Sequence, residues 1–517
     1  MRRLKLTPAA KEILFILIVS IVGFGAYKSG AINDIKNLFN AEKTVDSTVA
    51  YEKAAKINKA EGTMNISLDE WIGWKPIIDA NGGLTTQPGS IYDELGLKLN
   101  ISVINDGTQS SNALIKGDLN GAGYTINRYA FLYPKFQSSN IPVQMAYITN
   151  TSTGGDGIIA KKGINRIEDL VEKKIGIPRF SEAQTLVEWL MAHSSLTQVQ
   201  IDDIRNNMVM FDTPDDAAKA FFAGELDAAA TWQPYLSQAA ETTNGHILFS
   251  TKDATNIIVD GIVFRKDYID ANQESISKLI EGALKAETLY TTDFKAIKNT
   301  FPMFAVETDE NLKAIAGDAT LTNNASNVKM LVKDGIATTL FSDMSDIWKT
   351  VGETSAKDFA KDAFTDTFVQ ALATKFPGEK TQAVTFTEEQ RTEAKTQDNN
   401  AALLSTKLTI TFENNSASIA SESYAALGAF ANTAKILNGT VIQLEGNTDD
   451  VGDADSNKLL SEKRAKAVSF YLQGMGIDTT RFVIIGNGED KPVADNGTDA
   501  GKAANRRTDV YFKVVNK

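Results

Sequence analysis

Two oppositely charged residues near the end of the chain have the types and the spacing to hold a ligand that carries both charges. Asp449 opens a stretch with four aspartates within seven residues, 449–455, and Arg464 follows fifteen residues after it. A carboxylate binds an ammonium group, and a guanidinium binds a carboxylate through two parallel hydrogen bonds. The alternative is an internal ion pair that stabilises the loop, and the spacing alone leaves both interpretations open.

The elements predicted around these residues place them on opposite sides of a small cleft. Residues 440–444 are a predicted strand, and 457–473 are a predicted helix that carries Leu460 and Arg464 on one face at i, i+4 spacing. Asp449 follows the strand closely, so we expect its side chain to face the helix. This arrangement suits a zwitterion between a strand exit and a helix, and an internal Asp–Arg pair that stabilises the turn remains the alternative.

The composition excludes several other kinds of chemistry. The net charge is −12, which argues against nucleic acid as a partner because phosphates require a basic surface. The chain has no cysteine and only two histidines, His193 and His246, and it contains no G-x-S-x-G, H-E-x-x-H or P-loop motif. The aspartates at 449–455 could suggest calcium, but the EF-hand spacing is absent. We therefore expect no enzyme activity, no cofactor and no metal site.

The first 30 residues predict export from the cytoplasm. Four basic residues precede an uncharged run of fifteen residues, 13–27, which would span about 22 Å as a helix. We predict a retained inner-membrane anchor over 1–30 with the bulk of the chain in the periplasm, and a cleaved signal peptide is the alternative. Residues 31–61 are a predicted polar helical neck.

The rest of the chain divides into a long α/β region and a shorter domain. Strand and helix signals alternate from 62 to 375, with a helix start at Thr213, whose side chain is followed by proline and two acids. This alternation predicts mainly parallel sheets with ligands at the carboxyl ends of the strands. Residues 376–404 are polar and predicted to be a linker, and 405–517 form the last domain.

The last domain resembles the OmpA-like peptidoglycan-binding domains. The matching motifs are Thr448-Asp449-x-x-Gly452, Asn457-x-x-Leu460-Ser461-x-x-Arg464-Ala465, Gly474-x-Gly476-Ile477, Gly486-x-Gly488-Glu489-x-x-Pro492 and Asn505-Arg506-Arg507. The resemblance implies an α+β fold and a site for the diamino acid of the peptidoglycan stem peptide. It assigns ligand contacts to Asp449 and Arg464, support to Asn457 and Thr448, and to Arg506 and Arg507 the role of propping the site rather than touching the ligand. Asn447 stands where the family has histidine.

Residues 62–375 resemble the periplasmic substrate-binding proteins of nitrate, sulfonate, taurine and thiamine-precursor ABC importers. The cues are Glu70-Trp71-x-x-Trp74, Gly154-Gly-Asp-Gly157, Ile167-Glu-Asp-Leu170, Gly224-Glu-Leu-Asp227, Trp232-Gln-Pro234 and Ile258-Val-Asp260. The resemblance implies the type II fold, in which two α/β lobes close on a small solute by hinge motion.

Polar and aromatic residues at predicted strand exits and helix starts are the candidates for solute binding. They are Trp71, Trp74, Thr125, Asn127, Asp156, Ser181, Gln184, Thr185 and Trp232. Free N–H groups at a helix start attract anions, but Glu182 stands at the same helix start as Ser181. We therefore expect either a neutral or cationic solute, or a glutamate that points to solvent.

Together these features predict a non-catalytic envelope protein that binds peptidoglycan at one end and a small solute in its central domain. An ABC permease or another membrane complex would be its partner. The alternatives are a scaffold or sensor whose central domain is ligand-free or regulatory, a stator-like subunit of an ion-driven complex, and an enzyme. The predicted membrane helix contains no acid within 13–27, which argues against the stator.

Overall fold

The computed structural model describes residues 62–352, 360–378, 384–399, 402–408, 410–413 and 416–515. The predicted membrane anchor, 1–30, and the predicted neck, 31–61, lie outside these residues. Among the described helices, none is both long and apolar enough to cross a bilayer. The central domain (62–378) and the C-terminal domain (384–515) are described separately below.

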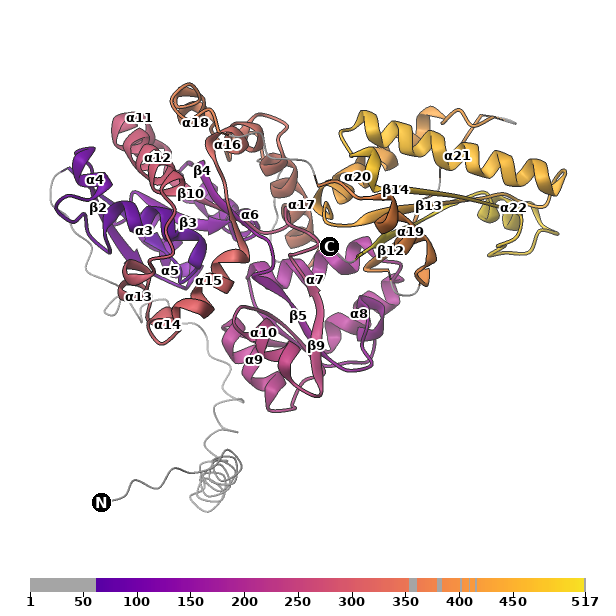
Figure 1. The fold of residues 1–517 in the computed structure, drawn as a ribbon, viewed down its shortest axis with the longest axis horizontal. Helices are drawn as coiled ribbons and strands as arrows, with labels where there is room; N and C mark the ends of the chain where they lie inside the picture. Colours follow the sequence, from indigo (N-terminus) through magenta and orange to yellow (C-terminus); the bar gives the residue numbers. More distant parts are fainter. Residues whose placement is uncertain are drawn as a thin grey trace, which may run out of the picture. The chain divides into compact units, whose positions relative to one another are not determined.

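The first lobe of the central domain is built on a mixed six-stranded sheet (Figure 1). Its strand order is β11 (Ala319–Leu321), β4 (Val143–Ser152), β10 (Val259–Arg265), β3 (Gly121–Thr125), β1 (Thr63–Leu68) and β2 (Lys98–Val103). β1 is parallel to β2 and β3, whereas β10 is antiparallel to β3 and β4. Its helices are α3 (Lys75–Asn81), α4 (Ile91–Glu94), α5 (Gly107–Lys116), α6 (Ile126–Ser138), α11 (Lys266–Ala271), α12 (Gln273–Thr288), α13 (Lys295–Thr300), α14 (Pro302–Ala305), α15 (Asp309–Gly317), α16 (Asn324–Leu331), α17 (Ile336–Thr350) and α18 (Thr367–Ala371).

The second lobe has a five-stranded sheet of the same kind. Its strand order is β7 (Met208–Phe211), β6 (Ile175–Pro178), β8 (Ala228–Trp232), β5 (Asp156–Lys161) and β9 (Gly245–Ser250). Its helices are α7 (Glu182–His193), α8 (Gln198–Asn206), α9 (Pro214–Phe222) and α10 (Tyr235–Glu241), with α9 and α10 packed together on one apolar cluster. The predicted helix start at Thr213 is confirmed, because its hydroxyl accepts a hydrogen bond from the Asp216 backbone N–H.

The prediction of mainly parallel sheets is wrong. β5 pairs antiparallel with β8 and β9, as β10 does with its neighbours in the first lobe. The reason is that the chain passes between the lobes twice, from β4 to β5 and from β9 to β10. A strand that arrives from the other lobe enters the sheet without the helical crossover that produces parallel pairing.

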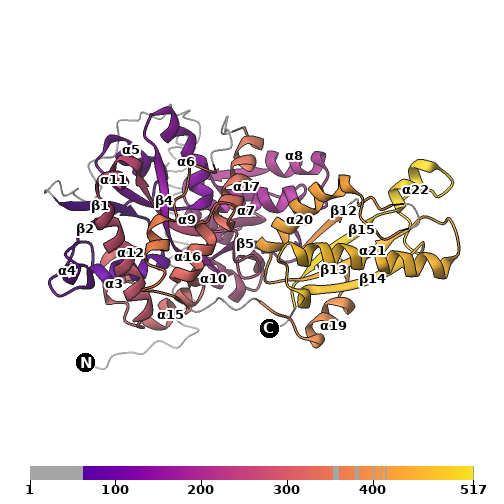
Figure 2. The same ribbon diagram turned by 90° about the horizontal axis from the view of Figure 1, so that it is seen from above.

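The C-terminal domain is a four-stranded sheet between helices (Figure 2). The strand order is β12 (Leu404–Leu408), β15 (Thr508–Lys513), β13 (Val441–Asn447) and β14 (Phe482–Gly488), and only β13 and β14 are parallel. Its helices are α19 (Glu388–Thr396), α20 (Tyr424–Ile436), α21 (Ala454–Gly474) and α22 (Asp499–Asn505). The predicted strand at 440–444 and helix at 457–473 are confirmed as β13 and α21.

Alternation along β13 gives this sheet two buried faces. Ile442 and Leu444 pack in the core with residues of α20 and α21. Val441 faces the other way and packs with Phe386, just before α19, and with Ala394 of α19. The segment 376–404 therefore differs from the predicted linker, since α19 covers part of the sheet. Its composition is polar because only one narrow side of α19 is buried.

Candidate ligand-binding sites

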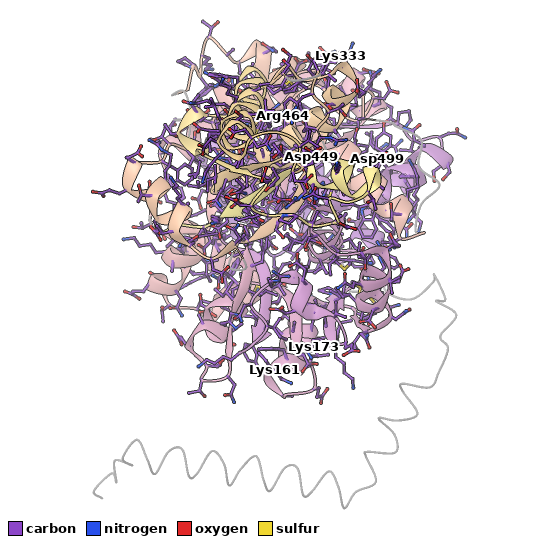
Figure 3. All side chains as sticks on the ribbon, turned by 90° about the vertical axis from the view of Figure 1, so that its right-hand side faces the viewer. Lys161, Lys173, Lys333, Asp449, Arg464 and Asp499 are labelled. Atoms are coloured by element: carbon purple, nitrogen blue, oxygen red, sulfur yellow. The ribbon has the colours of Figure 1, made fainter. Side chains whose placement is uncertain are left out.

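A cavity of about 740 Å³ in the C-terminal domain lies where the sequence places the charged pair. Asp449 enters it from the loop after β13, and Arg464 enters it from α21, so both side chains line the same space (Figure 3). Gly446 permits this arrangement, because a Cβ there would lie 2.2 Å from the Ser461 carbonyl oxygen of α21. The close approach of strand and helix therefore sets the width of the site.

Asp449 and Arg464 have separate partners within the described residues. The Arg506 Nη1 atom lies 2.5 Å from Asp449 Oδ2, and the Asp449 side chain is 12% exposed. Arg464 donates from Nε to the Ser416 carbonyl oxygen at 3.1 Å, and its guanidinium lies 4.9 Å from the centre of the Phe412 ring. The alternative of an internal Asp449–Arg464 ion pair is therefore not what the structure has.

Burial and two neighbouring charges shift the pKa of Arg464. Burial lowers the pKa of Arg464, the nearby Arg506 lowers it further, and Asp449 raises it. The cavity lining carries both signs of charge, with the acids Glu413, Asp449 and Asp499 and the bases Arg464, Lys502, Arg506 and Arg507. Such a lining suits a ligand that carries both an ammonium group and a carboxylate.

The supporting residues also lie at this cavity. Asn457 donates from Nδ2 to Glu489 Oε2 at 2.7 Å and, more weakly, to the Asp449 carbonyl oxygen at 3.4 Å. Thr448 lines the cavity, and its buried Oγ1 atom has no partner among the described residues. This unpaired hydroxyl is an exception, because buried hydroxyl groups are normally paired.

The two consecutive arginines occupy different positions. Both line the cavity, but Arg507 pairs with Asp509 at 2.8 Å, and both of those side chains are less than a tenth exposed. Arg506 pairs with Asp449 and is 47% exposed. α22 ends at Asn505 and the turn after it points Arg506 toward Asp449, so Arg506 contacts and supports the side chain of a predicted ligand-binding residue.

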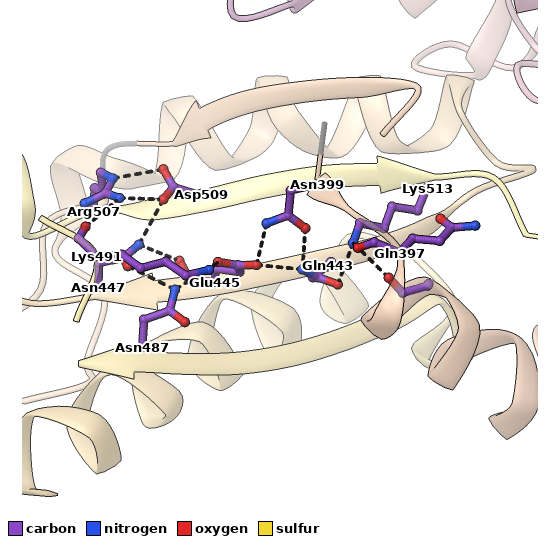
Figure 4. A network of polar contacts seen from close by, with 11 residues as sticks. Gln397, Asn399, Gln443, Glu445, Asn447, Asn487, Lys491, Arg507, Asp509 and Lys513 are labelled. Carbon is purple, nitrogen blue, oxygen red and sulfur yellow. Dashed lines mark hydrogen bonds and ion pairs between the residues drawn. The ribbon is translucent and has the colours of Figure 1, made fainter. Parts of the chain in front are cut away.

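A buried polar network runs along the sheet next to the site (Figure 4). Glu445 accepts hydrogen bonds from Gln443, Asn399 and Asn487 and an ion pair from Lys491. Asn447 accepts from Asn487 and donates to Asp509, at 3.1 Å each. Asn447 is therefore satisfied by protein groups and orders the strand end from which Asp449 leaves.

The central domain has its own cavity, of about 540 Å³, between the two lobes. The first lobe contributes Asp106 and Arg128, and the second contributes Ser181, Asp215 and Trp232. Of the nine predicted solute-binding residues, only Ser181 and Trp232 line this cavity.

The other seven predicted residues do not line this cavity. Trp71 donates to Asn150 and Trp74 donates to Asp69, and both rings are buried in the core. The predicted aromatic wall is therefore absent from the cavity, because the Trp74 ring packs against Gly123 of β3 and the Trp71 ring packs against Gly155. The remaining five are also buried, and they are Thr125, Asn127, Asp156, Gln184 and Thr185.

Glu182 does not point to solvent. Only 3% of the residue is exposed, and its Oε2 atom lies 3.1 Å from Arg128 Nη2 in the other lobe. Burial, together with the charge of Glu182, raises the pKa of nearby Asp156 to about 7. Glu182 and Asp156 are thus two buried acids that lie close to each other.

Sequence reasoning missed Phe412, Ser416, Asp499 and Lys502 at the C-terminal cavity, and Arg128 in the central cleft. Arg128 had a detectable signal, since it lies three residues after the capping Thr125 at the start of α6. The others come from loops and from a short helix outside the recognised motifs.

Both domains match known families. Residues 411–506 match the OmpA family and residues 70–303 match the NMT1-like family. The chain is 37% identical over 102 residues to the peptidoglycan-associated lipoprotein of Pseudomonas putida, covering 20% of this chain and 61% of that protein. It is 24% identical over 278 residues to a Brucella abortus protein named as a binding protein, covering 53% of this chain and 82% of that protein.

Among solved structures, the periplasmic aliphatic sulphonate binding protein SsuA from Escherichia coli is similar. The identity is 15% and the TM-score is 0.45, covering 57% of this chain and 94% of that one. The chain spans between 34% and 61% of the length of the first curated relatives. The chain therefore contains a domain of the NMT1-like family followed by a C-terminal domain of the OmpA family.

Proposed function

We propose that this protein is a non-catalytic component of the bacterial envelope that binds peptidoglycan through the C-terminal cavity and a small solute through the central cleft. The supporting observation is that Asp449 and Arg464 line one cavity without being paired to each other. A stem-peptide diamino acid carries an ammonium group and a carboxylate at the end of its side chain. Asp449 would bind the first and Arg464 the second, with Arg506 close to both.

The similarity to the peptidoglycan-associated lipoprotein of Pseudomonas putida supports the same ligand. The likeness of the central domain to the NMT1-like family supports a solute-binding role. The basic and apolar residues of 1–30 support anchoring in the inner membrane, with both domains in the periplasm. An ABC permease is the partner that such a solute-binding domain would serve.

Co-sedimentation with purified sacculi tests the peptidoglycan part. The variant Asp449→Ala/Arg464→Ala removes one charge of each sign, so the net charge of the protein is unchanged. We expect it to remain in the supernatant while the wild-type chain sediments. Lys466→Ala is the matched control, because Lys466 lies on the same helix, is 57% exposed and does not line the cavity.

Two results would contradict the proposal. One is equal sedimentation of the double variant and the wild-type chain, with both folded by circular dichroism. The other is an equal loss in the Lys466→Ala control, which would indicate general electrostatic attraction. Calorimetry of the full chain against a panel of small metabolites tests the solute-binding part, and the absence of any binding would favour a scaffold.

A further inference from the structure

The starts of two helices, one in each lobe, contact each other beside the central cleft. Thr125 caps α6 in the first lobe and Ser181 caps α7 in the second, each accepting a hydrogen bond from a backbone N–H of its helix. The Asn127 Nδ2 atom donates to Thr185 Oγ1 at 2.9 Å, so the first turns of the two helices touch. Helix starts carry partial positive charge, and two of them at one place favour an anion there.

Arg128 adds a full positive charge at the same place. Its guanidinium lies 3.1 Å from Glu182 Oε2 and 3.5 Å from Asp69 Oδ2, and the Arg128 side chain is 12% exposed. Glu182 is the first residue of α7, so its carboxylate lies at one helix start and contacts the arginine near the other. The position that would attract an anionic solute therefore holds the protein's own carboxylate.

The second oxygen of Glu182 strengthens this interpretation. Oε1 is buried and has no hydrogen-bond partner among the described residues. An unpaired buried carboxylate oxygen is costly, so its position is not explained by local hydrogen bonding alone. A second anion entering the cleft would find Arg128 already paired with two acids, so that both of its Nη atoms would already face carboxylates.

We propose that Glu182 is a specificity-determining residue that occupies the anion position between α6 and α7, so that the cleft rejects anionic solutes and accepts neutral or positively charged ones. This rests on the proposed solute-binding role of the central domain. The cleft lining agrees with it, because Glu70, Asp106, Asp212 and Asp215 outnumber Arg128 and Arg179 there.

Titration calorimetry of the full chain with sodium sulfate and sodium methanesulfonate, at constant ionic strength, tests the proposal. We expect no measurable binding to the wild-type chain. Glu182→Ala should leave Arg128 and both helix starts available to an anion. It should bind at least one of these anions, with a Kd at least about tenfold below the lower limit that the assay sets on the wild-type Kd. Glu182→Gln keeps the shape of the side chain and should gain in the same direction, which covers the case in which the alanine variant does not fold.

Glu188→Gln is the matched control. Glu188 lies on the same helix, is 3% exposed and pairs with Arg205 at 2.7 Å, but both residues belong to the second lobe. It should gain no anion binding, because no second helix start faces that pair.

Three results would overturn the proposal: wild-type binding of either anion as tight as in the Glu182 variants, no gain in a folded Glu182 variant, or an equal gain in Glu188→Gln. Failure of the wild-type chain to bind any solute would instead count against the proposed solute-binding function. The gain in the Glu182 variants would still be expected in that case.

Discussion

Replacing Asp449 with asparagine should separate ligand binding from folding in the C-terminal domain. The substitution keeps the size of the side chain and an oxygen that can accept from the Val451 backbone N–H, and it removes only the negative charge. The ion pair with Arg506 is lost, but Arg506 is 47% exposed, so the pair contributes at most about 1 kcal/mol to stability. For a domain of this size, the Tm should fall by less than about 6 °C.

The loss of ligand binding should be much larger. A hydrogen bond between charged groups contributes about 1.5–3 kcal/mol, which corresponds to a roughly ten- to 150-fold increase in Kd. Arg506 would then face the ligand's ammonium group without its own carboxylate partner, and this repulsion adds to the loss. Asp449→Asn should therefore weaken ligand binding by more than it lowers the stability of the domain.

Calorimetry of the full chain with a soluble stem peptide that contains the diamino acid measures the first quantity, and thermal unfolding measures the second. Asp450→Asn is the matched control, since Asp450 is the next residue, is exposed and lies outside the cavity lining. A Kd for Asp449→Asn within twofold of wild type would refute the reasoning. So would an equal loss in Asp450→Asn, because the effect would then be one of net charge.

Three further substitutions test other parts of the structure. Gly446→Ala should destabilise the C-terminal domain by about 2–4 kcal/mol in chemical unfolding, because the new Cβ would meet a carbonyl oxygen of α21. Its control is Gly428→Ala on α20, where a Cβ has open space; this variant should be neutral or stabilising by up to about 1 kcal/mol. Lys513→Met should increase amide hydrogen exchange over α19, because the buried Lys513 Nζ donates to two carbonyl oxygens at the end of that helix. Unchanged exchange over α19 in the variant would contradict this prediction. Burial raises the pKa of Asp156 to about 7, so the folded state binds an extra proton and stability should be lost as the pH rises from about 4 to 7. Asp156→Asn should remove on the order of 4 kcal/mol of this pH dependence. Parallel curves of Tm against pH for the variant and the wild-type chain would show the reasoning to be wrong.

The sequence allowed prediction of the C-terminal site where local patterns decide the structure. β13 and α21 follow from alternation and helical periodicity, and these two elements place Asp449 and Arg464 at one cavity. The partners of Arg464 could not be predicted in the same way. Ser416 and Phe412 belong to a loop some 50 residues earlier, and only packing of the whole domain brings that loop to α21.

Predictions failed where the direction of a side chain depends on tertiary packing. Trp71 and Trp74 follow a strand exit, as binding residues often do, but space beside Gly123 and Gly155 admits their rings to the interior. Both glycines are far away in sequence, so no local pattern links them to the tryptophans. The orientation of Glu182 was open for the same reason, since its arginine partner lies in the other lobe.

Arg128 in the central cleft and Arg464 in the C-terminal cavity differ in the protein groups that their guanidinium groups contact. Arg128 contacts two carboxylates inside the protein, so both sides of its guanidinium are occupied before any solute arrives. Arg464 makes one hydrogen bond through Nε and stacks on an aromatic ring, and among the described residues its two Nη atoms have no acidic partner. Only Arg464 therefore keeps the geometry for a bidentate bond to an incoming carboxylate. Lysine cannot make that bond, so Arg464→Lys should weaken binding of the stem peptide even though the charge is kept. Equal affinity in Arg464→Lys would show that charge alone, and not the shape of the guanidinium, holds the ligand.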